Sequence, residues 1–127
     1  MGRSNKELIE AVILSIGDEI LIGRTLDTNS NLIAKKLNDA GIVIKRIAAL
    51  SDNPKDIKQS FENAFADADI IISTGGLGPT EDDRTKDVLC ELYNVKLILN
   101  EKVLNKIEYY LRLRGRKINK NNYRQAL

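Results

Sequence analysis

The sequence predicts an α/β domain of three layers, in which helices cover both faces of a mainly parallel sheet. Short apolar runs rich in β-branched residues alternate along the chain with segments whose apolar residues recur at helical spacing. The connections between these segments are short, and residues that cap or end helices stand at their boundaries. Alternation of this kind is typical of parallel sheets.

Four apolar runs are predicted as strands, and the first is the most uniform. Residues 11–16 (AVILSI) carry no charge and precede a glycine, as expected for a strand buried on both faces. The run at 69–73 (DIIIS) consists mostly of isoleucine, a β-branched residue that favours strands. The other two predicted strands are 42–50 (IVIKRIAAL) and 95–99 (VKLIL).

Four helices are predicted between and after these strands, from capping residues and apolar spacing. Proline in Asn53-Pro54 suits the first position of the second helix. The helices begin at Asp27, at Asn53, near 79–83 and at Asn100, and the first and last end at Gly41 and Gly115. The final stretch, 119–127, has the pattern of a further element.

Length and composition indicate one soluble domain, which we expect to span 1–127. The chain is 43% hydrophobic and 30% charged, as globular proteins are. No window approaches the roughly 18 apolar residues of a membrane span, and the charged N-terminus lacks a signal-peptide pattern. One cysteine, Cys90, cannot form an internal disulfide. We therefore expect a cytoplasmic protein with no membrane partner.

Charge is distributed unevenly along the chain. Residues 101–127 carry eight of the 20 basic groups and two of the 18 acids, a net +6, whereas the first 100 residues are −4. The tyrosines of this tail, Tyr109, Tyr110 and Tyr123, do not alternate with its basic residues as a stacking platform for nucleic acid would. We therefore interpret the tail as a solvated helix face and do not expect nucleic acid as a partner.

The chain contains no histidine, which excludes several kinds of catalytic site. Serine–histidine and cysteine–histidine pairs are impossible, as are histidine ligands to zinc. Proton transfer must therefore depend on Asp, Glu, Lys, Tyr or a metal-bound water.

Ligands of parallel α/β sheets bind beyond the carboxyl ends of the strands. Three predicted loops leave those ends, at 17–29, 51–54 and 74–83, and all are rich in Gly, Asp, Glu, Asn or Thr. We expect these loops to meet at one place.

The third loop has the composition of an anion site. In STGGLGPT, Gly75, Gly76 and Gly78 allow sharp turns and a close approach to a ligand. A helix that starts near 79–83 would point its unpaired N–H groups at the same place. The loop matches neither GxxxxGK[ST] nor GxGxxG. Taken alone, the glycines are also compatible with a simple tight turn. The hydroxyls that could add hydrogen bonds belong to Ser73, Thr74 and Thr80.

Acidic residues follow this loop in the sequence and also stand in the two loops that we expect to meet it. Their negative charge would repel a phosphate bound there. First-turn acids such as Asp82 and Asp83 also complement a helix dipole. Dipole compensation does not explain why Asp18 and Glu19 follow the first strand and Asp52 follows the second. Carboxylates near a phosphate site suggest a divalent cation, and Mg²⁺ is the expected ion.

Two motifs resemble a known family. GDEILIGRTLDTN (17–29) and STGGLGPTEDDRT (73–85) are similar to the molybdopterin-binding-like domain of CinA proteins, which is shared by the MogA, MoaB and MoeA groups. The Pro-Thr pair and the two adjacent aspartates favour the CinA branch. The resemblance implies a three-layer α/β fold. For the CinA branch it implies metal-dependent hydrolysis of ADP-ribose to AMP and ribose 5-phosphate, and for the other branch molybdopterin binding, adenylylation or metal loading.

The resemblance also assigns roles to residues. Asp83 would be the acid at the reaction centre, as base or metal ligand, with Asp52 as a second catalytic acid. The metal would be held by Glu19, Asp82 and Asp83. The phosphate and nucleotide would contact Ser73, Thr74, Gly75, Gly76, Gly78, Thr80, Asp18, Glu19 and Asn29.

Three functions therefore follow as hypotheses. The first is metal-dependent hydrolysis of a nucleotide diphosphate-sugar such as ADP-ribose, the second is molybdopterin handling, and the third is a non-catalytic nucleotide-binding or assembly module. In each case the partner is a phosphorylated small molecule. CinA-type domains continue beyond a segment like 121–127, so we expect the domain to be incomplete there. An open sheet edge would then favour a homo-oligomer.

Overall fold

The computed structural model describes residues 8–127 and contains a parallel sheet of three strands in the order β2-β1-β3. The strands are β1 (Glu10–Ile16), β2 (Val43–Leu50) and β3 (Ile70–Thr74). Cα pairing runs from Ala11 opposite Ile70 to Ser15 opposite Thr74 on one side of β1. The first three predicted strands are thus confirmed to within about two residues.

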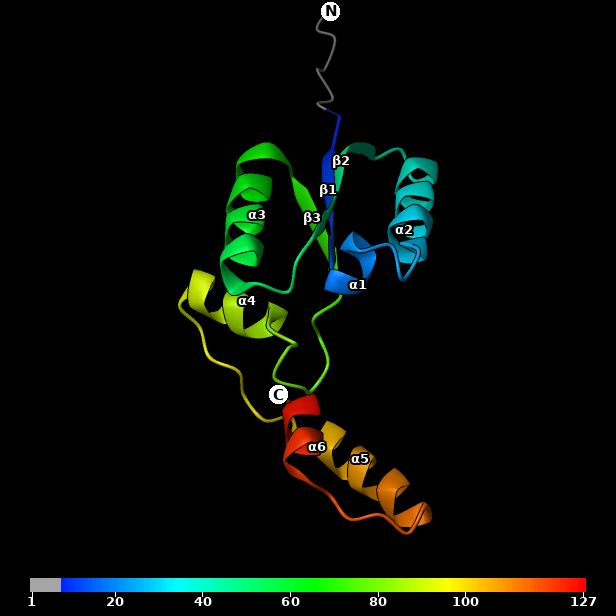
Figure 1. Ribbon diagram of the computed structural model, residues 1–127, viewed down its shortest axis with the longest axis vertical. Coiled ribbons are helices and arrows are strands. Elements are labelled where there is room, and N and C mark those ends of the chain that lie inside the picture. The colour runs from blue at the N-terminus through cyan, green and yellow to red at the C-terminus, as the bar shows by residue number, and fades with distance from the viewer. Residues whose placement is uncertain (1–7) are drawn as a thin grey trace, which may run out of the picture.

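Helices cover both faces of the sheet, so the predicted three-layer architecture is confirmed (Figure 1). One face carries α2 (Thr28–Asp39) and the other carries α3 (Pro54–Asp67). The short α1 (Asp18–Leu21) follows β1 directly, and α4 (Thr85–Tyr93) packs against α3. None of the described helices is long and apolar enough to cross a membrane.

The core lies between the sheet and α3, and β1 is its centre. All side chains from Ala11 to Ile16 are buried because both edges of β1 are paired and both faces are covered. Alternate residues of β1 face α3, as the period of a strand requires. The buried cluster consists of Val12, Leu14, Ile16, Leu50, Ile57, Phe61, Ala64 and Val88.

Three of the four predicted helix starts are confirmed by side-chain caps. Asp27 accepts a hydrogen bond from the amide of Ser30 at 3.0 Å, and Asn53 accepts one from Lys55 at 2.9 Å. Asn100 likewise caps α5 (Glu101–Leu113). Each cap satisfies an amide that the first helical turn leaves unpaired.

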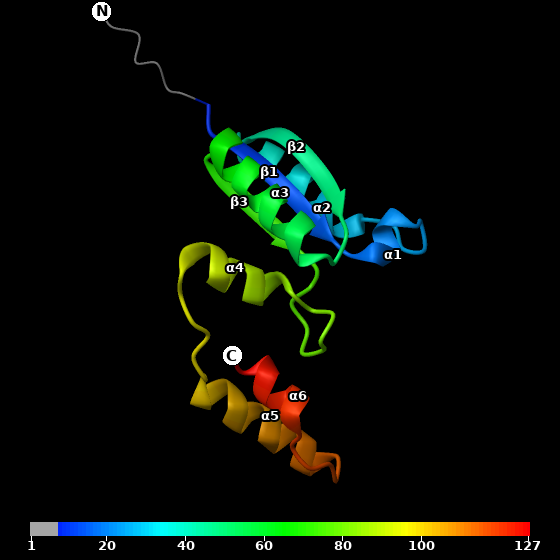
Figure 2. The ribbon, with the colours of Figure 1, turned by 60° about the vertical axis from the view of Figure 1, so that its left-hand side comes forward.

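The prediction of a strand at 95–99 is wrong. This segment has no strand partner and joins α4 to α5 as an extended linker. Its apolar side chains are largely solvent-exposed, with Val95 at 57% and Ile98 at 82%. A strand needs a neighbour for its backbone hydrogen bonds, and this segment leads away from both open edges of the sheet (Figure 2). Local residue preference therefore did not decide its conformation.

The last two helices form an arm apart from the sheet, as both ribbon views show (Figures 1 and 2). The predicted element at 119–127 is confirmed as α6 (Lys120–Gln125), which begins with a capping box. The arm is tied to α4 through Lys86, whose Nζ donates to the carbonyls of Arg124 and Leu127 at 3.2 and 3.3 Å. Arg124 also pairs with Asp87 at 3.5 Å.

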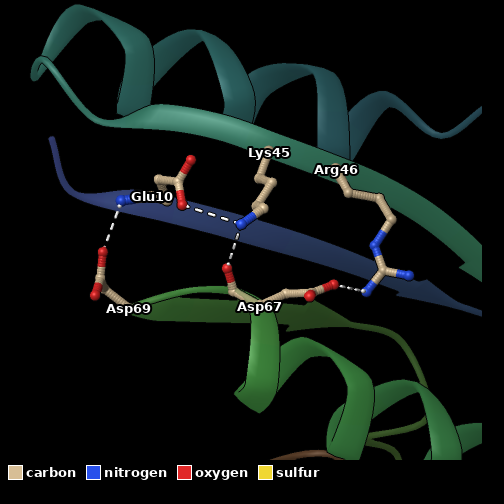
Figure 3. Close-up of polar contacts among 5 residues, drawn as sticks. All are labelled: Glu10, Lys45, Arg46, Asp67 and Asp69. Atoms are coloured by element: carbon tan, nitrogen blue, oxygen red, sulfur yellow. Dashed lines mark hydrogen bonds and ion pairs between the residues drawn. The ribbon is translucent and has the colours of Figure 1, made fainter.

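An ion-pair network closes the opposite end of the sheet from the glycine loop (Figure 3). Lys45 Nζ donates to Glu10 Oε2 at 3.1 Å and to the carbonyl of Asp67 at 2.8 Å. The amide of Glu10 donates to Asp69 at 2.9 Å. These side chains are exposed enough for water to weaken the attraction. The network therefore connects β1 and β2 to the turn between α3 and β3, and we expect it to contribute little to the free energy of unfolding.

Two phenylalanines of α3 provide a matched test of the core. Phe61 is 4% exposed inside the cluster, whereas Phe65 is 45% exposed and packs at the surface against the rings of Phe61 and Tyr93. We expect Phe61→Ala to lower the free energy of unfolding by about 3–5 kcal/mol and Phe65→Ala by about 1 kcal/mol. Urea unfolding followed by circular dichroism measures both. Equal losses would contradict the assigned core.

Candidate functional site

The carboxyl end of the sheet brings the three predicted loops together. The amide of Gly17, after β1, donates to the carbonyl of Leu50 in β2 at 3.0 Å. Asp18 and Asp52 then exchange hydrogen bonds, since each amide donates to the other carboxylate at 3.2 and 3.3 Å. The loop after β3 meets the same place because Gly75 lies against the carbonyl of Ile16.

The glycines of the third loop are required by its own packing. Gly75 and Gly76 have φ of +90° and +61°, which side-chain-bearing residues rarely adopt. A Cβ on Gly75 would overlap the Ile16 carbonyl, and one on Gly76 would overlap Thr85 Oγ1. A Cβ on Gly78 would lie 2.5 Å from Asp83 Oδ2. The loop therefore has a defined, tightly packed conformation.

Thr85 fastens this loop to α4. Its hydroxyl donates to the carbonyl of Gly75 at 3.0 Å, its amide donates to the carbonyl of Gly76 at 3.1 Å, and its side chain is fully buried. The prediction that the helix begins near 79–83 is wrong, because α4 begins at Thr85. With the helix start placed too early, the role of Thr85 is not apparent from the sequence. The signal for this role is a hydroxyl residue directly after the acidic run, because hydroxyl residues are common where helices begin.

Asp83 is held inside its own loop. Its Oδ2 accepts hydrogen bonds from Thr80 Oγ1 at 2.6 Å and from the Thr80 amide at 3.0 Å. The Thr80 hydroxyl is the main cause that lowers the pKa of the Asp83 carboxyl, against partial burial, and the charge of Arg124 adds a smaller effect. A carboxylate with a lowered pKa is a weak proton acceptor at neutral pH. Its position therefore suits ordering the loop, or binding a cation, better than general-base catalysis.

Asp27 and two buried serines lie beside the root of the loop. Partial burial acts to raise the pKa of the Asp27 carboxyl. The effects of Ser30 and of the nearby Ser15 hydroxyl, which favour the charged carboxylate, together outweigh burial, so the pKa lies below its ordinary value. Neither serine hydroxyl makes a hydrogen bond of normal geometry with a residue of the described chain. Because Ser15 pairs with Thr74 across the sheet, this polar group adjoins the start of the glycine loop.

The other predicted site residues lie at the same end of the molecule without forming one cluster. Ser73 and Thr74 are the last residues of β3. Asn29 is exposed in the first turn of α2, and the Glu19 carboxylate folds back over Gly17. Asp82 is exposed beside Asp83.

The described residues do not supply a ready-made metal centre. Within residues 8–127, no three acidic or cysteine side chains are grouped so that they could hold a metal ion. The contact between Asp18 and Asp52 and the contact between Thr80 and Asp83 remain two separate pairs. The Mg²⁺ site expected from Glu19, Asp82 and Asp83 therefore stays a prediction.

Arg124 is a residue near the site that sequence reasoning missed. The sequence predicts a solvated face for the basic tail, but Arg124 pairs with Asp87 and its charge acts on Asp83. The contact between Arg124 and Asp87 exists because α6 packs near α4 in the fold, and no pattern of neighbouring residues predicts that packing.

The Thr80–Asp83 contact predicts a specific pH effect. Removing the hydroxyl in Thr80→Val should raise the pKa of Asp83, whereas Thr80→Ser should keep it low. Because the folded pKa is lowered, the contact stabilises the fold above the unfolded-state pKa and stops doing so as pH falls through the folded value. Titration of the carboxyl carbon by NMR measures this. An unchanged pKa in Thr80→Val would refute the assignment.

Comparison with known proteins identifies a family that matches this chain. A family described as "Probable molybdopterin binding domain" matches residues 12–120. A CinA-like protein of Dictyoglomus thermophilum is 42% identical over 114 residues, which is 90% of this chain and 28% of the relative. The chain thus spans less than a third of that curated relative.

Solved structures agree with the fold. The structure of the protein CinA of Thermoplasma acidophilum superposes with a TM-score of 0.80 at 29% identity, covering 94% of this chain and 69% of that one. The molybdopterin biosynthesis enzyme MoaB of Thermus thermophilus gives a TM-score of 0.65 at 22% identity, with coverages of 93% and 72%, a likeness of fold alone. On the strength of the match over residues 12–120, the chain belongs to the molybdopterin-binding domain family and is similar to CinA-like proteins.

Proposed function

We propose that the glycine loop, residues 75–84, binds the phosphate of a molybdopterin-type ligand. The observation that carries this proposal is the shape of the loop. Gly75 lies against Ile16 and Thr85 holds two loop carbonyls, so the backbone is ordered before any ligand arrives. Pre-ordered backbone amides bind an anion without the entropy cost of arranging them. The description of the matched family supports a pterin phosphate as that anion.

The acidic residues near the loop are compatible with phosphate because their charges are already engaged. Asp83 directs its carboxylate to Thr80, and Asp27 directs its own to the first turn of α2. Arg124 supplies a positive charge close enough to lower the pKa of Asp83. The repulsion that the acids would exert on a bound phosphate is thereby reduced.

Metal-dependent hydrolysis of ADP-ribose is the second candidate, and one observation favours it. Asp18 and Asp52 bring two carboxylates together from adjacent loops at the edge of the sheet. Two carboxylates and a substrate phosphate are a common Mg²⁺ environment. In this alternative Asp18 and Asp52 would hold the metal, which would polarise a phosphoryl oxygen, and the glycine loop would hold the neighbouring phosphate. A third candidate, nucleotide binding without turnover, needs the loop alone.

The role of Thr85 leads to a binding prediction. Thr85→Val is nearly isosteric but removes the hydrogen bond to Gly75, so it should weaken molybdopterin binding by about tenfold. Thr85→Ser retains the hydroxyl and should bind within about threefold of the original chain. Anaerobic isothermal titration measures both affinities, and circular dichroism checks that each variant is folded. Equal affinities for the valine and serine variants would show that the loop is not the binding element.

A second experiment separates the candidate functions. The chain is titrated with ADP-ribose and then incubated with it and Mg²⁺, while AMP is followed by chromatography. We expect no AMP release. Release that disappears in Asp52→Asn would replace the proposal by hydrolysis. Tight binding of ADP-ribose with neither turnover nor affinity for molybdopterin would replace it by nucleotide binding.

A further inference from the structure

Two buried hydroxyl groups, those of Ser15 and Ser30, are not explained by the fold or by the proposed function. Ser15 is fully buried in β1, and Ser30 is 2% exposed in the first turn of α2. Among residues 8–127, neither hydroxyl oxygen has a hydrogen-bond partner of normal geometry. Buried hydroxyls in folded proteins nearly always have one, because leaving such a group unpaired is costly. The pair therefore indicates a partner that is not a protein side chain.

Both hydroxyls belong to the side of the sheet that α2 covers. Leu14 and Ile16 belong to the core cluster on the α3 side, so Ser15 between them points to the opposite face, as the period of a strand requires. That face carries α2 (Figure 1). Ser30 is the only buried residue of α2, although helices normally bury an apolar stripe. At its most buried position, α2 therefore presents a hydroxyl group instead of an apolar side chain.

Asp27 brings a carboxylate to the same place. Its Oδ1 accepts a hydrogen bond from the amide of Ser30 at 3.0 Å, which leaves Oδ2 for other donors. Burial acts to raise the pKa of this carboxyl, but the nearby hydroxyls of Ser30 and Ser15 help to lower it. Neither hydroxyl, however, forms a direct hydrogen bond of normal geometry with the carboxylate. Polar groups that approach one another without bonding directly are commonly bridged by water.

We propose that a buried water molecule is bound between Ser15 Oγ, Ser30 Oγ and the carboxylate of Asp27. Water suits these partners because it can donate to the carboxylate and accept from a hydroxyl at the same time. Three polar partners also match the two to four that buried waters usually contact. An anion would be repelled by Asp27. A larger ligand would not reach the two hydroxyl oxygens, because both are closed off from solvent.

The bound water would connect the start of α2 to the end of β1. Ser15 pairs with Thr74 across the sheet, so the water site lies next to the strand end from which the glycine loop leaves. Buried waters with several protein partners behave as part of the structure and are costly to remove. The proposal does not depend on which ligand the glycine loop binds.

Removing the two hydroxyls tests the site. A high-resolution crystal structure of the original chain should show a water about 2.7–3.2 Å from both hydroxyl oxygens and from Asp27. The double variant Ser15→Ala, Ser30→Ala should lose this water. Ser60→Ala is the matched control, because Ser60 is a partly buried serine of α3 on the other side of the sheet, and it should keep the water. Circular dichroism checks that each variant is folded.

A solution measurement accompanies the crystal structures. Magnetic relaxation dispersion of water oxygen should count about one long-lived water fewer in the double variant than in the original chain and the control. If the double variant does not fold, the single variants Ser15→Ala and Ser30→Ala replace it, and each should shorten the residence time of the water by about tenfold.

Three results would overturn the proposal. The first is a direct hydrogen bond from each serine to Asp27 with no water between them. The second is a water that stays at this place in the double variant, since its ligands would then be other groups. The third, where only the single variants fold, is a residence time that neither of them changes.

Discussion

The burial of β1 from Ala11 to Ile16 is the constraint on which the rest of the molecule depends. Both edges of this strand are paired and both faces are covered, so its apolar residues leave no freedom of register. The parallel pairing on each side then places the ends of all three strands at one edge. The loops meet there as a consequence. Gly17 and Gly75 both contact the backbone at the strand ends, which brings the loops after β1 and β3 to the same edge.

Elements whose signals are local were predictable from the sequence. The uninterrupted apolar run of β1, the isoleucines of β3 and the caps Asp27, Asn53 and Asn100 all specify structure through their immediate neighbours. Convergence of the loops followed from the general geometry of parallel sheets. The glycine loop was located by composition alone.

The errors came where distant contacts decided the outcome. The segment 95–99 has the composition of a strand but no available neighbour, so it became a linker. The helix after the loop begins only at Thr85, because Thr85 donates hydrogen bonds to the carbonyls of Gly75 and Gly76 in the loop. Arg124 reaches Asp87 only through the return of α6. None of these outcomes is encoded within a window of neighbouring residues.

Arg124 connects the arm, formed by the last two helices, to the glycine loop. One guanidinium pairs with Asp87 on α4 and also acts on Asp83 in the loop. An anion bound at the loop would draw on that same positive charge. Loss of the Arg124 charge would therefore weaken both the contact of the arm with Asp87 and the binding of the anion proposed for the loop.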